Sequence, residues 1–322
     1  MPVITSSAYN PGFIYKSGHF QTVFPTLFRK VKGVAYRRQR IETPDNDFID
    51  LDFSQVSSAD SAVIICHGLE GSSDRAYMRG MALAFNSANI DAICYNYRSC
   101  SGEMNRQMRM YNAGATDDLD LVVQHILSQK KYKSLILTGF SLGGNLVLKY
   151  GGEHSSTINK KVKSIVAISA PCDLHNSAIE LHKKQNFFYQ KRFIIMLKEK
   201  IELKKKDFPE LAKIDLNSIK TLWDFDDRIT APVHGFKDAM DYWTKSSSSP
   251  VLGKIKIPAL ILNAVDDPIL GEKCYPFDEA EKSRFLFLEA PKYGGHVGFI
   301  SGEKDPVYYS EKRALEFALK YK

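Results

Sequence analysis

The sequence predicts an α/β fold in which helices flank a mostly parallel central sheet. Short, continuous apolar runs recur along the 322 residues, helical segments separate them, and polar residues or glycines follow several runs directly. The run at 62–66, which leads into His67-Gly68, is a clear example. Continuous apolar runs of this length indicate strands that are buried on both faces, as they are in parallel sheets.

The expected elements alternate along the chain. A strand with period two covers 48–53, where Ile49, Leu51 and Phe53 share one face. The segment 115–129 carries apolar residues at helical spacing. Further strands are expected at 62–66, 90–95, 134–140, 162–170, 258–263 and 284–288, and further helices at 77–88, 142–151, 276–282 and 306–321.

Two parts of the chain depart from this alternation. Between residues 172 and 253 it gives way to polar, Lys-rich and aromatic helical segments, which we interpret as a helical cap inserted at the carboxyl edge of the sheet. Residues 1–45 show weak periodicity with several glycines, prolines and aromatic residues, and we expect an extension packed on the core. The core is then formed by 46–171 and 254–322.

Composition limits the class of protein. No stretch approaches the roughly 18–20 apolar residues that span a bilayer, and the first residues lack secretory-signal features, so we expect a soluble, cytoplasmic protein. The five cysteines show no CxxC spacing or Cys/His clustering, which favours reduced thiols over a disulfide framework or a metal site. The net charge of +7 comes with no nucleic-acid recognition motif, and we expect no nucleic-acid partner.

A candidate nucleophile lies in Gly139-Phe140-Ser141-Leu142-Gly143, which has the form G-x-S-x-G. The motif follows an apolar run and precedes a helical segment, which is the strand–turn–helix setting of a nucleophile elbow. A serine in such a tight turn has a strained backbone and needs small neighbours. The elbow predicts the α/β-hydrolase fold, with Ser141 as nucleophile; the alternative is an ordinary N-cap serine in a glycine-rich turn.

A serine nucleophile needs an imidazole base oriented by a carboxylate, and in this fold the chain order is Ser, Asp or Glu, His. The expected strand 258–263 leads to Asp266-Asp267-Pro268, and His296 follows the next strand after two glycines. We therefore predict His296 as the base. Asp266 and Asp267 compete for the acid; Pro268 fixes the turn after Asp267, which favours Asp267, and the other aspartate would cap or solvate the loop.

The loop that begins at His67-Gly68-Leu69 follows an early strand, where this fold supplies a donor to the oxyanion hole. We predict the backbone amides of Leu69 and Leu142 as the donor pair. His67 is expected to order this loop rather than to act as a base. The alternative is a plain helix-entry loop.

Taken together, these motifs resemble the YheT-like branch of the α/β hydrolases, which includes lipid-cleaving α/β-hydrolase-domain proteins of animals. The resemblance covers nearly the whole chain and implies carboxylic ester hydrolysis by Ser141, Asp267 and His296. The animal relatives carry an N-terminal membrane-spanning helix; this chain shows none, so membrane residence is not expected. The matching segments are 18–22, 43–48, 67–72, 96–102, 139–145, 224–227, 266–268 and 294–299.

We therefore expect a cofactor-free serine esterase or lipase-like enzyme acting on a small-molecule ester or lipid through an acyl-enzyme. A thioesterase or amidase could use the same triad, and a binding pseudo-enzyme could keep the fold without turnover. Neither the sequence nor the resemblance indicates an oligomeric state.

Within the expected cap, residues 177–206 hold nine Lys/Arg and three Glu, interleaved with aromatic residues such as Phe187, Phe188 and Phe193. One hypothesis is contact with anionic lipid head groups, with the apolar face guiding an acyl chain. The pattern favours the alternative, a helix whose apolar face lies on the core and whose lysines lie in water.

Overall fold

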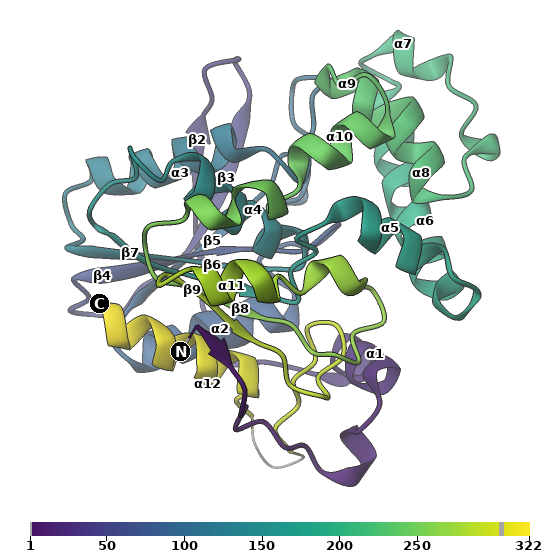
Figure 1. The fold of residues 1–322 in the computed structure, drawn as a ribbon. Coiled ribbons are helices and arrows are strands. Elements are labelled where there is room, and N and C mark those ends of the chain that lie inside the picture. Colours follow the sequence, from purple (N-terminus) through teal and green to yellow (C-terminus); the bar gives the residue numbers. More distant parts are fainter. Residues whose placement is uncertain (1, 303–305) are drawn as a thin grey trace.

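The structure is a computed structural model that describes residues 2–302 and 306–322. Its centre is a nine-stranded sheet in the order β1-β9-β8-β7-β6-β4-β5-β3-β2, with helices on both faces (Figure 1). All neighbouring strands pair in parallel except β5–β3 and β3–β2, which are antiparallel. The strands are β1 (Val3–Ile4), β2 (Arg37–Glu42), β3 (Phe48–Ser54), β4 (Ser61–Cys66), β5 (Asp91–Asn96), β6 (Ser134–Phe140), β7 (Val162–Ile168), β8 (Ala259–Leu262) and β9 (Leu286–Glu289).

The α-helices are α1 (Gly18–Phe28), α2 (Ala76–Ser87), α3 (Thr116–Ser128), α4 (Leu142–Glu153), α5 (Leu174–His182), α6 (Phe187–Lys204), α7 (Pro209–Ala212), α8 (Leu222–Phe225), α9 (Ala231–His234), α10 (Ala239–Ser246), α11 (Phe277–Lys282) and α12 (Tyr309–Tyr321). Short 3-10 turns are η1 (Phe13–Tyr15), η2 (Lys184–Asn186), η3 (Leu216–Ser218), η5 (Ser249–Lys254) and η6 (Glu272–Cys274), and a π-helical turn, η4 (Asp226–Thr230), joins α8 to α9. The predicted α/β class with a mostly parallel sheet is confirmed.

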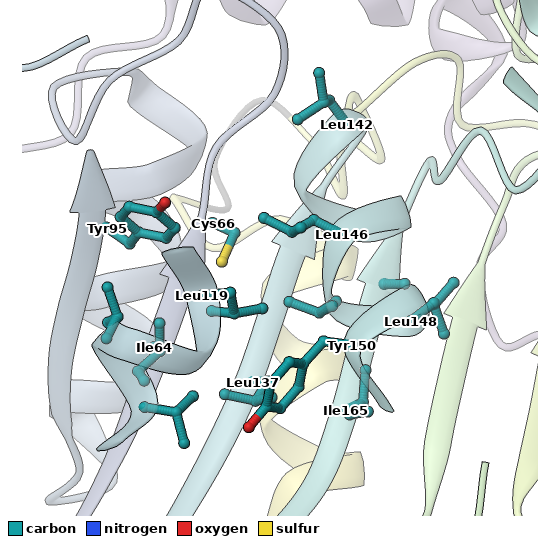
Figure 2. Packing of buried hydrophobic residues seen from close by; sticks show 14 of the residues in the cluster. Ile64, Cys66, Tyr95, Leu119, Leu137, Leu142, Leu146, Leu148, Tyr150 and Ile165 are labelled. Carbon is teal, nitrogen blue, oxygen red and sulfur yellow. The ribbon is translucent and has the colours of Figure 1, made fainter. Parts of the chain in front are cut away.

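An apolar layer packs on each face of the sheet, because alternate residues along a strand point to opposite faces. On one face, α3 and α4 place Leu119 and Leu146 over strand residues such as Ile64 and Leu137 (Figure 2). On the other face, α2 and α12 pack on the alternate strand residues. The central strands are fully buried, which is why their sequences read as continuous apolar runs.

Residues 1–45, expected to be an extension on the core, also supply the two edge strands of the sheet. The short strand β1 pairs with β9, and β2 pairs with β3. Polar composition hides β2 in the sequence, since Arg38 and Arg40 project from it and pair with the buried Asp52 and Asp50 of β3 at 2.8 Å. Charged edge strands of this kind discourage pairing between molecules.

Buried charge also explains part of the motif at residues 43–48. Arg98, which is 2% exposed, follows β5 and pairs with Asp47 and Asp118 at 2.9 and 2.8 Å. It also contacts Asp45 at 2.7 Å. A buried arginine needs such partners to offset the loss of hydration, and this network fixes the loop before β3 to the end of β5.

Between β7 and β8 the chain leaves the sheet and forms α5 to α10, which lie together at one side of the molecule (Figure 1). We call these the cap helices; the exact boundaries at residues 172 and 253 stay a prediction. They enclose an apolar cluster of their own, which includes Leu181, Ile194, Ile201, Leu216 and Phe225. This cluster packs over the carboxyl end of the sheet through Met110 and Ile269.

Candidate active site

Ser141 lies at the carboxyl end of β6, directly before α4. Its backbone has φ 52° and ψ −121°, in a region that residues with a side chain rarely adopt. The Ser141 amide is held by the Ile168 carbonyl of the neighbouring strand at 2.8 Å. The strained turn raises the hydroxyl above the sheet, which is the geometry of a nucleophile elbow.

The two glycines of the motif allow the chain to turn this tightly. A Cβ atom on Gly139 would lie 2.0 Å from the Gly143 carbonyl oxygen. A Cβ atom on Gly143 would lie 2.4 Å from the Cys66 carbonyl oxygen and 2.6 Å from that of His67. These obstacles are backbone atoms that cannot turn aside. The turn can therefore close only if Gly139 lacks a side chain, and α4 can approach β4 only if Gly143 lacks one.

We expect Gly143→Ala to lower the free energy of unfolding by about 3 kcal/mol or more, because the added methyl group meets backbone on β4. Alanine is the better helix former, so propensity alone would predict the opposite sign. Urea unfolding followed by circular dichroism measures the change. Gly253→Ala is the matched control, since a Cβ atom there meets nothing within 4 Å. Equal stabilities of the two variants would contradict the close approach.

Three side chains from distant parts of the chain form a continuous hydrogen-bonded line. His296 Nε2 lies 2.8 Å from Ser141 Oγ. On the other side of the ring, His296 Nδ1 lies 2.9 and 3.1 Å from the two carboxylate oxygens of Asp267. The Asp267 side chain is fully buried and that of His296 is 9% exposed. This order of hydroxyl, imidazole and carboxylate allows proton transfer away from the serine.

Asp266, the competing acid, points elsewhere. Its Oδ1 accepts a hydrogen bond from the Gly295 amide at 2.8 Å, in the loop that carries His296. Its Oδ2 is buried without a hydrogen-bond partner among the described residues. Burial, the largest cause, and the nearby Asp267 charge raise the pKa of Asp266, against the opposing effect of the hydrogen bond from the Gly295 amide. Asp266 therefore contacts the histidine loop and not the imidazole.

The loop around His296 rests on α1, a contact that no local sequence pattern predicts. Thr22 Oγ1 accepts a hydrogen bond from the His296 amide at 2.9 Å. The fully buried Gln21 accepts from the Ile300 amide at 2.9 Å. A Cβ atom on Gly18 would lie 1.9 Å from the Asp266 carbonyl oxygen. The motif at 18–22 thus supports the loops of the candidate acid and base, and its presence in the resemblance was the only signal for it.

The Leu69 and Leu142 amides, predicted as the oxyanion donors, belong to residues that line the same cavity as Ser141. Leu142 carries the first amide of α4, a position with no acceptor inside its own helix. In the 67–71 loop, the amides of Gly68 and Glu70 donate to tyrosine hydroxyls, whereas the Leu69 amide donates to no acceptor in residues 2–302 or 306–322. Both amides are thus available to a ligand.

Buried polar contacts fix the loop that carries Leu69. Glu70, at φ 54°, accepts a hydrogen bond from the Tyr111 hydroxyl at 2.5 Å and pairs with Lys200 of α6 at 3.0 Å. His67 Nδ1 donates to the Gly68 carbonyl at 2.7 Å, and burial lowers the pKa of His67 to about 3, which keeps the ring neutral. The cap helix α6 is therefore tied to the candidate oxyanion loop.

The basic stretch of α6 divides between two environments. Ile194, Leu197 and Ile201 are buried in the apolar cluster, as expected for a helix packed on the core. Its lysines do not all lie in water: Lys204 is 1% exposed and donates to backbone carbonyls at Asn105 and Gln107. The lysines and arginine near the start of α6 are exposed.

Two cavities meet at Ser141. One, of about 120 Å³, extends under the cap helices and has a largely apolar lining that includes Leu174, Leu181, Leu197 and Val233. The other, of about 200 Å³, opens between α1 and α6 and is also lined by His296. Ser141, Leu69 and Phe193 line both cavities, so the two spaces adjoin at the hydroxyl. An ester bound there would extend one part into each cavity.

The described residues contain no group of three or more His, Cys, Asp or Glu side chains placed to hold a metal ion. None of the helices in the described parts of the chain combines the length and the apolar character that crossing a bilayer requires.

The fold and this elbow define an α/β hydrolase, and the chain belongs to that family: the family model for the alpha/beta hydrolase fold matches residues 61–303. YheT of Escherichia coli (strain K12) is 31% identical over 325 residues, covering 98% of this chain and 94% of that protein, which confirms the YheT-like resemblance. Monoacylglycerol lipase of Saccharomyces cerevisiae (strain ATCC 204508 / S288c) is 28% identical over 296 residues, covering 89% of this chain and 64% of that protein. The Pyrococcus furiosus esterase PF2001 shares the fold, with a TM-score of 0.60 and 16% identity over 91% of this chain and 96% of that one. The protein is therefore a hydrolase of the esterase and lipase type.

Proposed function

We propose that the protein hydrolyses carboxylic esters with Ser141 as the nucleophile, His296 as the general base and Asp267 as the acid that orients the imidazole. The observation that carries the proposal is the hydrogen-bonded line from Ser141 Oγ to His296 Nε2 at 2.8 Å and from His296 Nδ1 to Asp267 at 2.9 Å. A free serine hydroxyl is a weak nucleophile at neutral pH, and an oriented imidazole is the usual means of activating it.

In the proposed reaction, His296 Nε2 takes the proton as Ser141 Oγ attacks the ester carbonyl. The tetrahedral oxyanion forms beside the Leu69 and Leu142 amides, which donate hydrogen bonds to it. His296 then passes its proton to the leaving alcohol. In the second step His296 takes a proton from water as the water attacks the acyl-enzyme, and it returns this proton to Ser141 Oγ as the carboxylic acid leaves. The buried Asp267 carboxylate stabilises the imidazolium that exists between these steps. No step requires a metal or an organic cofactor.

We propose that the substrate is a small-molecule ester or a lipid. The two cavities favour a binding mode in which the acyl chain and the alcohol lie in different cavities. The acyl chain occupies the cavity under the cap helices, because its lining is mostly aliphatic and aromatic. The alcohol occupies the cavity between α1 and α6, which contains Arg75 and Arg192 as well as apolar side chains. Release of the alcohol toward this second opening leaves the acyl-enzyme accessible to water.

A fluorophosphonate probe tests the proposal directly. We expect stoichiometric labelling, with the added mass on the tryptic peptide that contains Ser141, because the probe reacts only with an activated serine. Protein unfolded in urea provides the control and should not react. A folded protein that stays unlabelled, or that is labelled at another serine, would contradict the assignment and would favour a binding protein or another nucleophile.

We expect Ala178→Trp to lower kcat/KM for p-nitrophenyl octanoate by roughly tenfold while changing the value for the acetate by less than about threefold. Ala178, on α5, lines the cavity under the cap helices, so a larger side chain there removes space that a long acyl chain needs. Ile179→Trp, at the neighbouring and exposed position, is the matched control. Equal losses for both esters would show that the acyl chain binds elsewhere.

A further inference from the structure

Two segments of the chain are basic and poor in acids. Residues 1–41 contain seven Lys/Arg and no Asp or Glu, and residues 177–206 contain nine Lys/Arg against three Glu. Their net charges of +7 and +6 sum to +13, although the whole chain carries only +7. The remainder is therefore net negative, and the positive charge is concentrated in these two segments.

The same segments expose large apolar side chains. Phe13 of η1 is 88% exposed, and Phe28 at the end of α1 is 64% exposed. On α6, Phe188 is 80% exposed. Phe20, Val23, Leu27, Phe187 and Ile195 are exposed as well. Exposed apolar residues also occur singly elsewhere, as at Val265 and Leu319, and these need no explanation, but most of the exposed large apolar residues are concentrated in these two segments, which indicates a binding surface.

The two segments meet at the opening of the second cavity. His19 Nδ1 of α1 lies 2.9 Å from the Tyr189 hydroxyl of α6, and the two rings stack. Helices α1 and α6 both contribute to the lining of the cavity that contains Ser141 and His296. Among the exposed residues of these segments, Val23 and Leu27 of α1 and Arg192 of α6 line this cavity directly, and the exposed phenylalanines and lysines belong to the same two segments.

Several of the cations in these segments have no acidic partner. Lys30, Lys32, Lys184 and Arg192 are exposed and form no ion pair with a carboxylate in residues 2–302 or 306–322. Unpaired cations that accompany exposed aromatic side chains match the chemistry of an anionic lipid surface, which offers phosphates above a hydrocarbon layer. A second copy of the chain would bring the same positive charges together, which disfavours a symmetric dimer through this face.

We propose that η1, α1 and the first half of α6 form a face that docks on an anionic lipid bilayer, with the cavity between α1 and α6 turned toward the lipids. The phenylalanines insert at the head-group level, and the lysines and Arg192 pair with lipid phosphates. The docked orientation gives lipid esters a direct path to Ser141. The sequence hypothesis placed lipid contact on α6 alone; this proposal adds η1 and α1, and docking itself does not depend on the proposed reaction.

Vesicle co-sedimentation tests the proposal. We expect the protein to bind vesicles of phosphatidylglycerol and phosphatidylcholine in equal parts at least about tenfold more tightly than pure phosphatidylcholine, with the difference shrinking at about 1 M salt. The triple variant Phe13→Ser, Phe28→Ser, Phe188→Ser should weaken anionic-vesicle binding by roughly tenfold or more. Leu319→Ser, an exposed leucine on α12, is the matched control. None of the three phenylalanines lines the cavities, so hydrolysis of p-nitrophenyl acetate in solution should stay within about twofold.

The outcomes separate the alternatives. The proposal is overturned if the protein binds neither kind of vesicle. It is also overturned if the triple variant binds anionic vesicles as tightly as wild type. A wild-type dimer in light scattering that the triple variant converts to a monomer also overturns it, because a second copy would then cover the face. The Ser141→Ala protein should bind vesicles like wild type, so failure of docking and failure of the proposed catalytic role are distinguishable.

Discussion

Ser141→Ala should lower kcat for p-nitrophenyl butyrate by on the order of 10⁴-fold or more and should abolish fluorophosphonate labelling. The expected loss is large because the hydroxyl is the atom that would form the acyl-enzyme, and no other described side chain occupies its place beside His296 Nε2. The residual rate would come from the oxyanion donors and from binding alone.

Two measurements make this result specific to the nucleophile. The variant should unfold in urea at or above the wild-type midpoint, since alanine removes a hydroxyl from a strained position whose packing rests on backbone and glycines. Ser128→Ala, at an exposed position on α3, is the matched control and should keep full activity. An activity loss of less than about a hundredfold would assign the reaction to another nucleophile.

The sequence predicted the central elements well because each carries its own local signal. Strands β4 to β7 are buried on both faces and read as apolar runs, and α3 shows helical spacing. The strands β1 and β2 were missed for a physical reason. The two residues of β1 are too few to show a period, and the charged side chains of β2 are explained only by their partners on β3.

The candidate site shows the same division between local and distant information. The elbow around Ser141 is a local pattern, and the glycines that permit it lie two residues away. The support of His296 by Thr22 joins residues 274 positions apart, and nothing near either residue in the sequence predicts that contact. Lys200 was read as one of several lysines in water, whereas its contact with Glu70 depends on how α6 is laid over the sheet.

The choice between Asp266 and Asp267 also could not be made from spacing, because adjacent residues in one turn differ only in the direction of their side chains.

We expect Asp267→Asn to lower kcat by about 10³–10⁴-fold. Asparagine is nearly isosteric with aspartate. It keeps an oxygen that can accept the hydrogen bond that the Ile269 amide donates to Asp267 Oδ1 at 2.9 Å. The amide group is neutral, however, so it no longer places a full negative charge beside the N–H of His296 Nδ1. The imidazolium therefore loses its stabilisation.

Asp266→Asn is the matched control for Asp267→Asn, and we expect it to keep kcat within about fivefold. The substitution retains an acceptor for the Gly295 amide. Because burial raises the pKa of Asp266, the wild-type carboxyl favours folding most at low pH, and this contribution is lost as pH rises through the raised pKa. Asparagine cannot ionise, so the stability of the variant relative to wild type should increase from pH 4 to pH 7, as urea unfolding at both pH values would show. If Asp266→Asn instead removed activity and Asp267→Asn did not, the carboxylate that orients His296 would be Asp266, and the hydrogen bonds at Asp267 would be structural only.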